Sequence, residues 1–262
     1  MKIDFIHIGM HKTASTYLQK VVFPKVNGLN IINQSNEPWF YDQFIKLNPH
    51  KFDSDIFLKN FICKTDYMNN EGLDVLAISE ENISGDIYSG QSSRELMHRL
   101  KECFNDVQVL IVLRNPVDYI LSAYSNYILH GGTKTVKNWL FGQETRFGEI
   151  IEKLHYSYLV SDYIETFGRD NVTVIFYEKM FDKEDPISVF LKKFDLSYDK
   201  IIIEKVNTGR SLLANHVMAF LNPFNIYRLR GVQRIFNYFP SNSTNDRKKI
   251  KELLSVHHDS FN

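Results

Sequence analysis

Residues 3–19, I-D-F-I-H-I-G-M-H-K-T-A-S-T-Y-L-Q, place a glycine, a lysine and several hydroxyl groups between an apolar run and a helical pattern. Residues 5–8 predict a buried strand, and residues 14–22 predict a helix. Backbone N–H groups and the helix dipole favour an anion at the start of a helix. Lys12 adds a positive charge beside those groups. The segment therefore predicts a phosphate-binding loop between a strand and a helix.

Composition bounds the class of protein. A chain of 262 residues with 44% hydrophobic and 24% charged residues is typical of one large or two small folded domains. The chain has 31 basic residues (Lys and Arg) and 31 acidic residues (Asp and Glu). It therefore lacks the overall positive charge that would indicate a nucleic-acid partner. Cys63 and Cys103 are too few for a disulfide framework or a zinc site, and we expect both to be buried thiols. The N-terminus has no signal-peptide or membrane-span pattern, so we expect a cytoplasmic protein.

Strand-like and helix-like segments alternate after the first loop. Four further apolar runs predict parallel strands at 29–32, 75–78, 107–113 and 172–176. Helical patterns lie at 92–104, 116–129 and 148–167. Asn115-Pro116 is typical of a helix start, and Gly131-Gly132 and Gly168 are typical of helix ends. The order predicts an α/β fold, a P-loop-like open parallel sheet with helices on both faces, in a single domain spanning 1–262.

From about residue 222 the chain becomes basic and aromatic, and we expect a mostly helical C-terminal extension of the same domain. The simpler interpretation is a solvated amphipathic appendage that covers the core. The alternative is a surface for an acidic glycan or for peripheral membrane contact. The basic residues are Arg228, Arg230, Arg234, Arg247, Lys248, Lys249 and Lys251.

The first loop differs from that of nucleoside triphosphatases, whose motif is G-x-x-x-x-G-K-[ST]. His11 precedes the lysine, and Ile6 stands at the other glycine position. What remains is a shorter loop, suited to a terminal phosphate group beside Lys12. The alternative is that the serine and threonines only cap a helix.

A second element, V-Q-V-L-I-V-L-R-N-P-V-D-Y-I-L-S-A-Y at residues 107–124, puts Arg114 at the end of a predicted strand. Ligands of parallel sheets bind outside the carboxyl ends of the strands, so Arg114 faces the same edge as Lys12. Its planar fork suits a second phosphate, and Ser122 in the following helix can add a hydroxyl. The alternative is an arginine in a salt bridge at the strand end.

These residues resemble the sulfotransferases that use 3′-phosphoadenosine 5′-phosphosulfate, most closely their bacterial and carbohydrate (heparan-type) branch. Residues 11–16 resemble the family's 5′-phosphosulfate loop, and Arg114 followed by Ser122 resembles its 3′-phosphate signature. Segments 78–83, 162–172 and 206–211 extend the resemblance over most of the chain up to about residue 220. Ala14 replaces the usual glycine, which we expect only if this position has a negative φ.

The resemblance implies transfer of a sulfuryl group from 3′-phosphoadenosine 5′-phosphosulfate to an acceptor hydroxyl, with no metal required. Lys12 would stabilise the bridging oxygen and Glu81 would act as general base, with Glu80, His11 and His130 as alternative bases. Whether the product is O- or N-sulfated stays open. The residues implied to bind the donor are His11, Lys12, Thr13, Ala14, Ser15, Thr16, Arg114, Ser122, Gly209 and Arg210.

The acceptor is less constrained by the sequence. The aromatic content and the basic C-terminal region favour a glycan or glycolipid, whereas phenols, lipids and amines stay open. A magnesium-dependent nucleotide kinase with a degenerate P-loop is the alternative function, because the strand at 73–78 and the glutamates after it resemble a metal-holding strand end. A nucleotide-binding module without catalysis is the third hypothesis.

Overall fold

The computed structural model describes residues 3–69, 75–141, 149–181, 185–199, 211–224 and 243–258. The chain divides into two compact units. The first comprises Met1–Arg114 with His155–Ile201, and the second comprises Asn115–Leu154 with Ile202–Asn262. The expected grouping of 1–262 into a single domain stays a prediction.

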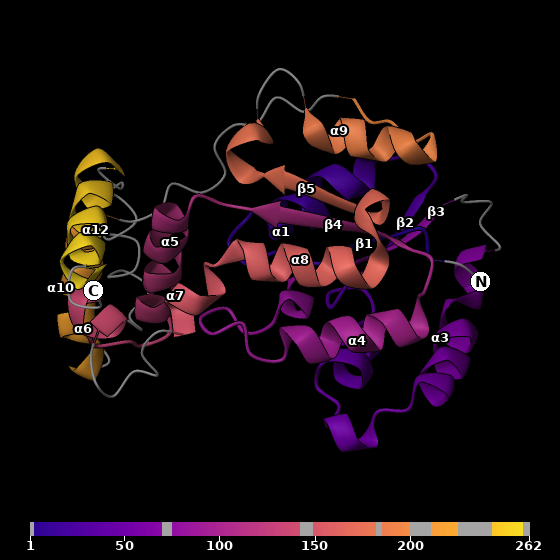
Figure 1. Ribbon diagram of the computed structural model, residues 1–262, viewed down its shortest axis with the longest axis horizontal. Coiled ribbons are helices and arrows are strands. Elements are labelled where there is room, and N and C mark those ends of the chain that lie inside the picture. Colours follow the sequence, from indigo (N-terminus) through magenta and orange to yellow (C-terminus); the bar gives the residue numbers. More distant parts are fainter. Residues whose placement is uncertain are drawn as a thin grey trace. The chain divides into compact units, whose positions relative to one another are not determined.

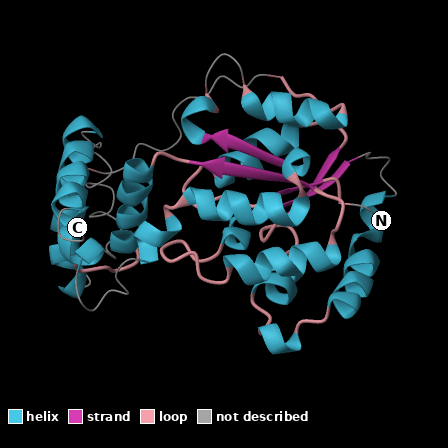
Figure 2. Cartoon of the chain, in the orientation of Figure 1, coloured by secondary structure: helices cyan, strands magenta, loops and turns pink. Residues whose placement is uncertain are grey.

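The first unit contains the predicted open sheet. The strands are all parallel and lie in the order β2-β3-β1-β4-β5. The arrowheads of β4 and β5 point the same way in Figure 2. Because β1 lies between β3 and β4, the loop that follows it opens at the middle of the carboxyl edge. The bounds are β1 (Phe5–His7), β2 (Leu29–Ile32), β3 (Val75–Ser79), β4 (Gln108–Leu113) and β5 (Val172–Phe176).

One face of the sheet packs on the helical residues that follow the first loop and on α9 (Pro186–Leu191). Side chains alternate between the two faces of a strand, so Phe5, Ala77 and Leu110 share this side. Phe5 meets Phe190 edge to face, with ring centroids 5.2 Å apart. The helical residues after the loop are α1 (Ser15–Tyr17), η1 (Leu18–Val22) and η2 (Phe23–Lys25).

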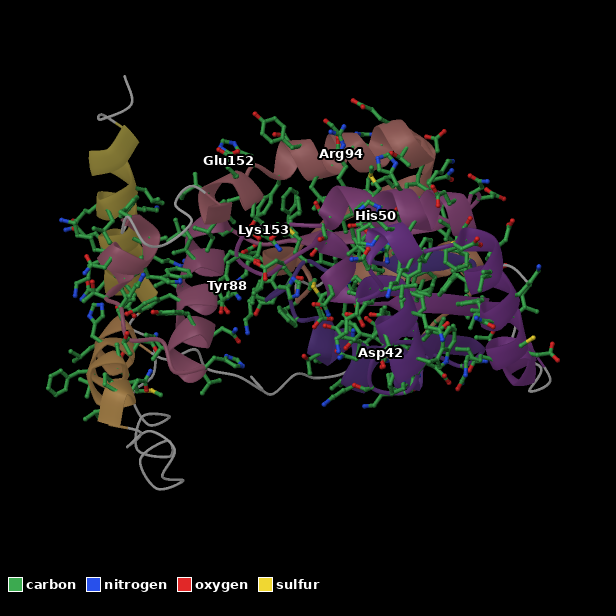
Figure 3. All side chains as sticks on the ribbon, turned by 90° about the horizontal axis from the view of Figure 1, so that it is seen from below. Asp42, His50, Tyr88, Arg94, Glu152 and Lys153 are labelled. Carbon is green, nitrogen blue, oxygen red and sulfur yellow. The ribbon has the colours of Figure 1, made fainter. Side chains whose placement is uncertain are left out.

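The other face is covered by α8 (Tyr156–Phe167), which contacts β4 and β5, with α4 (Ser93–Cys103) packed beside it. Figure 1 shows α8 and α4 on the opposite side of the strands from α9. Arg94 of α4, labelled in Figure 3, pairs with Asp162 of α8 at 3.5 Å. The predicted arrangement, with helices on both faces, is confirmed.

The chain between β2 and β3 forms helices that the sequence patterns did not predict: α2 (Pro38–Phe40), η3 (Tyr41–Ile45), η4 (Pro49–Lys51) and α3 (Ser54–Asn69). They share a cluster of aromatic rings, in which Phe40 stacks on Phe44 with centroids 5.0 Å apart. Arg99 of α4 is 4% exposed and donates to the carbonyls of Phe44 and Leu47 at 2.6 and 2.7 Å. This buried arginine therefore binds the segment between β2 and β3 to α4.

The second unit is helical in its described residues. Its helices are α5 (Pro116–Leu129), α6 (Val136–Phe141), α7 (Glu149–Lys153), α10 (Leu212–Leu221), η9 (Asn222–Phe224) and α12 (Ser243–His258). The guanidinium of Arg247 forms a bidentate pair with Asp118, joining α12 to α5 with both bonds at 2.6 Å. The helical C-terminus agrees with the prediction. Arg228, Arg230 and Arg234 lie outside the described residues.

The helix boundaries test the capping arguments. Asn115 accepts a hydrogen bond from the N–H of Val117 at 3.0 Å, and Gly168 follows the end of α8, so both expected boundaries are confirmed. The single helix predicted at 148–167 is wrong, because α7 ends at Lys153 and α8 begins at Tyr156. Cys63 is exposed, which corrects its expected burial. Over the described ranges, no helix combines the length and apolarity that a bilayer crossing needs.

Candidate functional site

The loop after β1 runs along β4 before it turns into α1. The N–H groups of Ile8 and Met10 donate to the carbonyls of Leu110 and Val112 at 3.1 and 3.0 Å. Lys12 and Ala14 then have φ of 61° and 65°, alternating with residues of ordinary φ. Left-handed residues in such alternation turn successive N–H groups toward a common concave side, where an anion binds. The backbone of this loop is therefore shaped as an anion cradle at the middle of the carboxyl edge.

Ala14 lies in the left-handed region, with φ 65° and ψ 26°. The expectation of a negative φ at this position is wrong. A non-glycine residue in this region costs about 1–2 kcal/mol, because its Cβ crowds the following carbonyl. The loop thus keeps the backbone shape that a glycine would favour while carrying an alanine.

The hydroxyl groups of the loop divide into inward and outward ones. Thr13 Oγ1 and Ser15 Oγ both donate to the carbonyl of Met10, at 2.5 and 3.1 Å, and both residues are buried. These two hydrogen bonds therefore stabilise the loop internally. Thr16 is exposed at the start of the helix. Among the loop hydroxyls, the exposed one of Thr16 is therefore the one that solvent reaches.

Arg114 follows β4 and reaches back to this loop. Its Nη1 donates to the carbonyl of Lys12 at 2.8 Å, and its guanidinium lies over the ring of Tyr177, 4.6 Å from the centroid. Tyr156 donates from its hydroxyl to the Arg114 carbonyl at 2.8 Å. Within the described ranges, Arg114 Nε is buried without a hydrogen-bond partner. The ring and the carbonyl hold the fork rigid and leave N–H groups for a second anion.

Lys12 is half-buried between groups of opposite charge. Burial lowers the pKa of its ammonium, Glu81 opposes that change, and the positive charge of Arg114 adds to it. The charges of the Glu81 carboxylate and of the Arg114 guanidinium therefore both act on Lys12. A cation in such a position can stabilise negative charge that develops on a leaving oxygen.

Glu81 begins η5 (Glu81–Ser84), the turn after β3, and is held from two directions. Gln19 Nε2 donates to Glu81 Oε2 at 3.2 Å and to the Ser79 carbonyl at 2.9 Å. On the other side, a Cβ added to Gly9 would lie 2.8 Å from the Glu81 Cβ. The glycine therefore lets the β3 turn approach the first loop, and the glutamine sets the direction of the carboxylate.

Glu80 has a different environment from its neighbour. It is 2% exposed, and its Oε1 accepts from the backbone N–H and the side-chain amide of Asn82 at 3.2 and 2.5 Å. Burial raises the pKa of this carboxyl, against the effect of those hydrogen bonds. Asn82 Oδ1 in turn lies 3.3 Å from His11 Nε2. Glu80 thus orders the turn and the loop histidine, whereas Glu81 is the carboxylate coupled to Lys12.

The remaining expected residues belong to the second unit or lie outside the described residues. Ser122 is part of α5 in the second unit. His130, also in that unit, is exposed, and its Nδ1 lies 2.8 Å from the Asn126 carbonyl at the end of α5. Gly209 and Arg210 lie outside the described residues.

A small cavity adjoins the loop on the β3 side. Its volume is about 160 Å³, and it is lined by Thr16, Gln19, Lys20, Gln34, Ser35, Glu80 and Glu81. The sequence argument did not include Gln19, Gln34 or Ser35. Gln34 and Ser35 follow β2, so their place after a parallel strand was the available signal. No sequence signal pointed to Gln19, because a glutamine inside a helix is ordinarily a surface residue.

Comparisons with known proteins connect this geometry to a fold. No protein-family model matches the chain, and no match is found among curated proteins. A crystal structure of a sulfotransferase from Alicyclobacillus acidocaldarius matches with a TM-score of 0.51 and 19% sequence identity, over 88% of this chain and 96% of that one. This chain has a sulfotransferase-like fold.

Proposed function

We propose that the chain is a sulfotransferase that moves a sulfuryl group from 3′-phosphoadenosine 5′-phosphosulfate to an acceptor hydroxyl. The observation that carries the proposal is the position of Lys12, in an anion-cradling loop that is hydrogen-bonded to Arg114 and electrostatically coupled to Glu81. Two cationic anchors suit a donor with two separate phosphate groups, and the carboxylate suits an acceptor that must lose a proton. The sulfotransferase-like fold supports the same class of activity.

In this proposal the loop binds the 5′-phosphosulfate. The N–H groups of residues 11–16 and the Thr16 hydroxyl contact its oxygens, since the hydroxyls of Thr13 and Ser15 are used within the loop. The fork of Arg114 binds the 3′-phosphate with the donors that the Lys12 carbonyl leaves available. Ser122, Gly209 and Arg210 complete that phosphate site by resemblance to the family.

The transfer step conserves charge and protons. The acceptor oxygen attacks sulfur and forms the new S–O bond, while the bond from sulfur to the bridging oxygen of the donor breaks. The electron pair of that bond stays on the 5′-phosphate of the departing adenosine 3′,5′-bisphosphate, next to the Lys12 ammonium. Glu81 takes the acceptor proton, and Gln19 keeps its carboxylate in place. The residues mainly position the reactants and stabilise charge, as in phosphoryl transfer.

The acceptor in this proposal is a carbohydrate hydroxyl on a glycan or glycolipid. The resemblance to carbohydrate-modifying members and the basic C-terminal region support it, and that region would serve peripheral membrane contact if the acceptor is a glycolipid. The same proposal includes that the enzyme acts in the cytoplasm and requires no metal. A magnesium-dependent nucleotide kinase fits less well, because His11 precedes Lys12 and because Arg114, instead of a carboxylate, follows β4.

The decisive experiment is a thermal-shift titration with adenosine 3′,5′-bisphosphate, ATP and 5′-AMP, each with and without magnesium. A ligand that binds only the folded state adds about 2.7 kcal/mol of stability at a hundred times its Kd. We expect the bisphosphate to raise Tm without magnesium and 5′-AMP to have little effect. Stabilisation by ATP only with magnesium would favour the kinase and reject the sulfotransferase.

A further inference from the structure

The cavity beside the first loop is polar throughout its lining. It is bordered by the carboxylates of Glu80 and Glu81, the ammonium of Lys20, and amide and hydroxyl side chains, with no aromatic or aliphatic residue among its lining residues. Its volume of about 160 Å³ corresponds to about five water molecules at the density of the liquid. A space of this size and polarity suits a single small, hydrogen-bonding group. It does not suit a phenol ring or a lipid chain, which require apolar walls.

The two sides of the carboxyl edge carry opposite charge. The strand order places Arg114 and Tyr177, which follow β4 and β5, on one side of the first loop. Glu80 and Glu81, which follow β3, lie on the other side with the cavity. Lys12 follows β1, which lies between β3 and β4, and the charges of both Arg114 and Glu81 act on it. The cationic side suits phosphate, so the acidic cavity is left for the other reactant.

We infer that this cavity receives the reacting unit of the acceptor and selects a hydroxyl- and amine-bearing group without negative charge, such as one amino-sugar ring. The inference rests on the proposed function. Two carboxylates against one ammonium disfavour an anionic group by like-charge repulsion and favour a cationic amine. The amides of Gln19 and Gln34 and the hydroxyls of Thr16 and Ser35 offer donors and acceptors to neutral hydroxyls.

The position of Glu81 determines which side of the cavity can accept a proton from a bound acceptor. Gln19 lines the same cavity and donates to Glu81 Oε2, which fixes the direction of the carboxylate. The charge of this carboxylate acts on Lys12. A hydroxyl or amine bound in the cavity therefore lies beside the base, Glu81. The cavity selects the charge of the acceptor, and Glu81 receives its proton.

The test uses three sugars of equal ring size and different charge: glucosamine, glucose and glucuronate. Binding of each is measured by saturation-transfer NMR on the full chain saturated with adenosine 3′,5′-bisphosphate. We expect glucosamine to bind most tightly and glucuronate at least about tenfold more weakly, a difference of about 1.4 kcal/mol. Glucuronate binding as tight as that of glucosamine, or no binding by any of the three, overturns the inference.

A pair of variants locates the binding. Ser35→Trp fills the cavity, and its backbone N–H bond to Asn33 Oδ1 at 2.8 Å does not depend on the side chain. Lys59→Trp adds the same ring at an exposed position of α3 and is the matched control. We expect Ser35→Trp to weaken glucosamine binding at least about tenfold and Lys59→Trp to leave it unchanged. Equal glucosamine binding by both variants places the sugar elsewhere and contradicts the inference.

Binding of the bisphosphate separates this inference from the proposed function. Ser35→Trp is expected to keep the thermal shift given by adenosine 3′,5′-bisphosphate, because the Arg114 side of the loop is unaltered. If the bisphosphate binds and the sugar order fails, the assignment of the acceptor is wrong while the donor site stands. If the bisphosphate does not bind to the unsubstituted chain, the proposed function itself fails.

Discussion

Arg114 Nη1 donates a hydrogen bond to the carbonyl of Lys12 at 2.8 Å, so the residue that follows β4 fastens the loop that follows β1. The same guanidinium lies over the Tyr177 ring. One side chain thus supports the shape of the loop and, in our proposal, binds the 3′-phosphate. Loop order and nucleotide affinity should therefore change together when this arginine is altered.

Arg114→Lys keeps the charge but loses the planar fork and the ring stacking. A hydrogen bond to a charged group contributes about 1.5–3 kcal/mol, so we expect the Kd of adenosine 3′,5′-bisphosphate to rise at least about tenfold. Isothermal titration measures the Kd, and Arg169→Lys, at an exposed arginine, is the control. An unchanged Kd in Arg114→Lys would remove this residue from the phosphate site.

Lys12→Met should separate stability from turnover. Because burial lowers the pKa of Lys12, its charged form is disfavoured in the folded state at pH values below that lowered pKa. Methionine keeps the length without the charge, so we expect Tm at pH 7 to rise while sulfuryl transfer is lost. Calorimetry and a donor-turnover assay test the two effects. A variant that keeps normal turnover would show that Lys12 does not stabilise the leaving oxygen.

The parts of the site that the sequence predicted depend on local signals. Asn115 caps α5 through a neighbour two residues away, and Gly131 has a φ of 95° just after that helix. Such signals are complete within a few residues, so strand ends and the residues behind them could be placed. Parallel pairing then brought Lys12, Glu81 and Arg114 to one edge.

What the sequence did not predict depends on distant contacts. Gln19 meets Glu81 across 62 positions, which no local pattern encodes. In α3 the apolar residues do not form one stripe, since Ile56 and Ile62 are exposed while Phe57 and Phe61 are buried, so helical periodicity was weak. The break between α7 and α8 falls at Leu154 and His155, where neither glycine nor proline signals an end.

His7 makes the fold sensitive to acid. Its ring is fully buried, with Nδ1 2.8 Å from Ser79 Oγ, and burial lowers its pKa from 6.5 to about 3. Between these values the unfolded chain binds a proton that the folded chain does not, so stability falls as pH falls. One proton corresponds to about 1.4 kcal/mol per pH unit.

His7→Gln should remove this contribution to the pH dependence. We expect the free energy of unfolding, measured with urea from pH 6 to 4, to fall less steeply than in the unsubstituted chain. His50→Gln, at the exposed histidine labelled in Figure 3, is the control and should keep the original slope. Identical slopes in all three proteins would show that His7 does not drive the acid response.

Ala14→Gly should stabilise the loop. At φ 65° glycine has no Cβ to crowd the following carbonyl, which favours the folded state. The larger entropy of glycine in the unfolded chain offsets part of this effect, so we expect a net gain of about 1 kcal/mol in the free energy of unfolding. Thr16→Gly, at an exposed helical position of α1, should instead lose about 0.3 kcal/mol, because threonine is itself a weak helix former. Urea denaturation measures both, and a loss of stability in Ala14→Gly would mean that the left-handed conformation of Ala14 is not strained.

Gly9→Ala should disturb the site through Glu81. Gly9 and Gly28 both have positive φ, 91° and 80°, so an alanine at either position carries a similar backbone penalty. The added Cβ at Gly9 would lie 2.8 Å from the Glu81 Cβ, whereas at Gly28 the nearest atom is Leu196 Cδ2 at 3.6 Å. We therefore expect Gly9→Ala to lose more stability than Gly28→Ala and to lose turnover as well, because Glu81 is pushed away from Lys12. The comparison uses urea denaturation and donor turnover at a temperature where both variants are folded. Equal turnover in the two variants would show that the close approach of Gly9 to Glu81 serves packing alone.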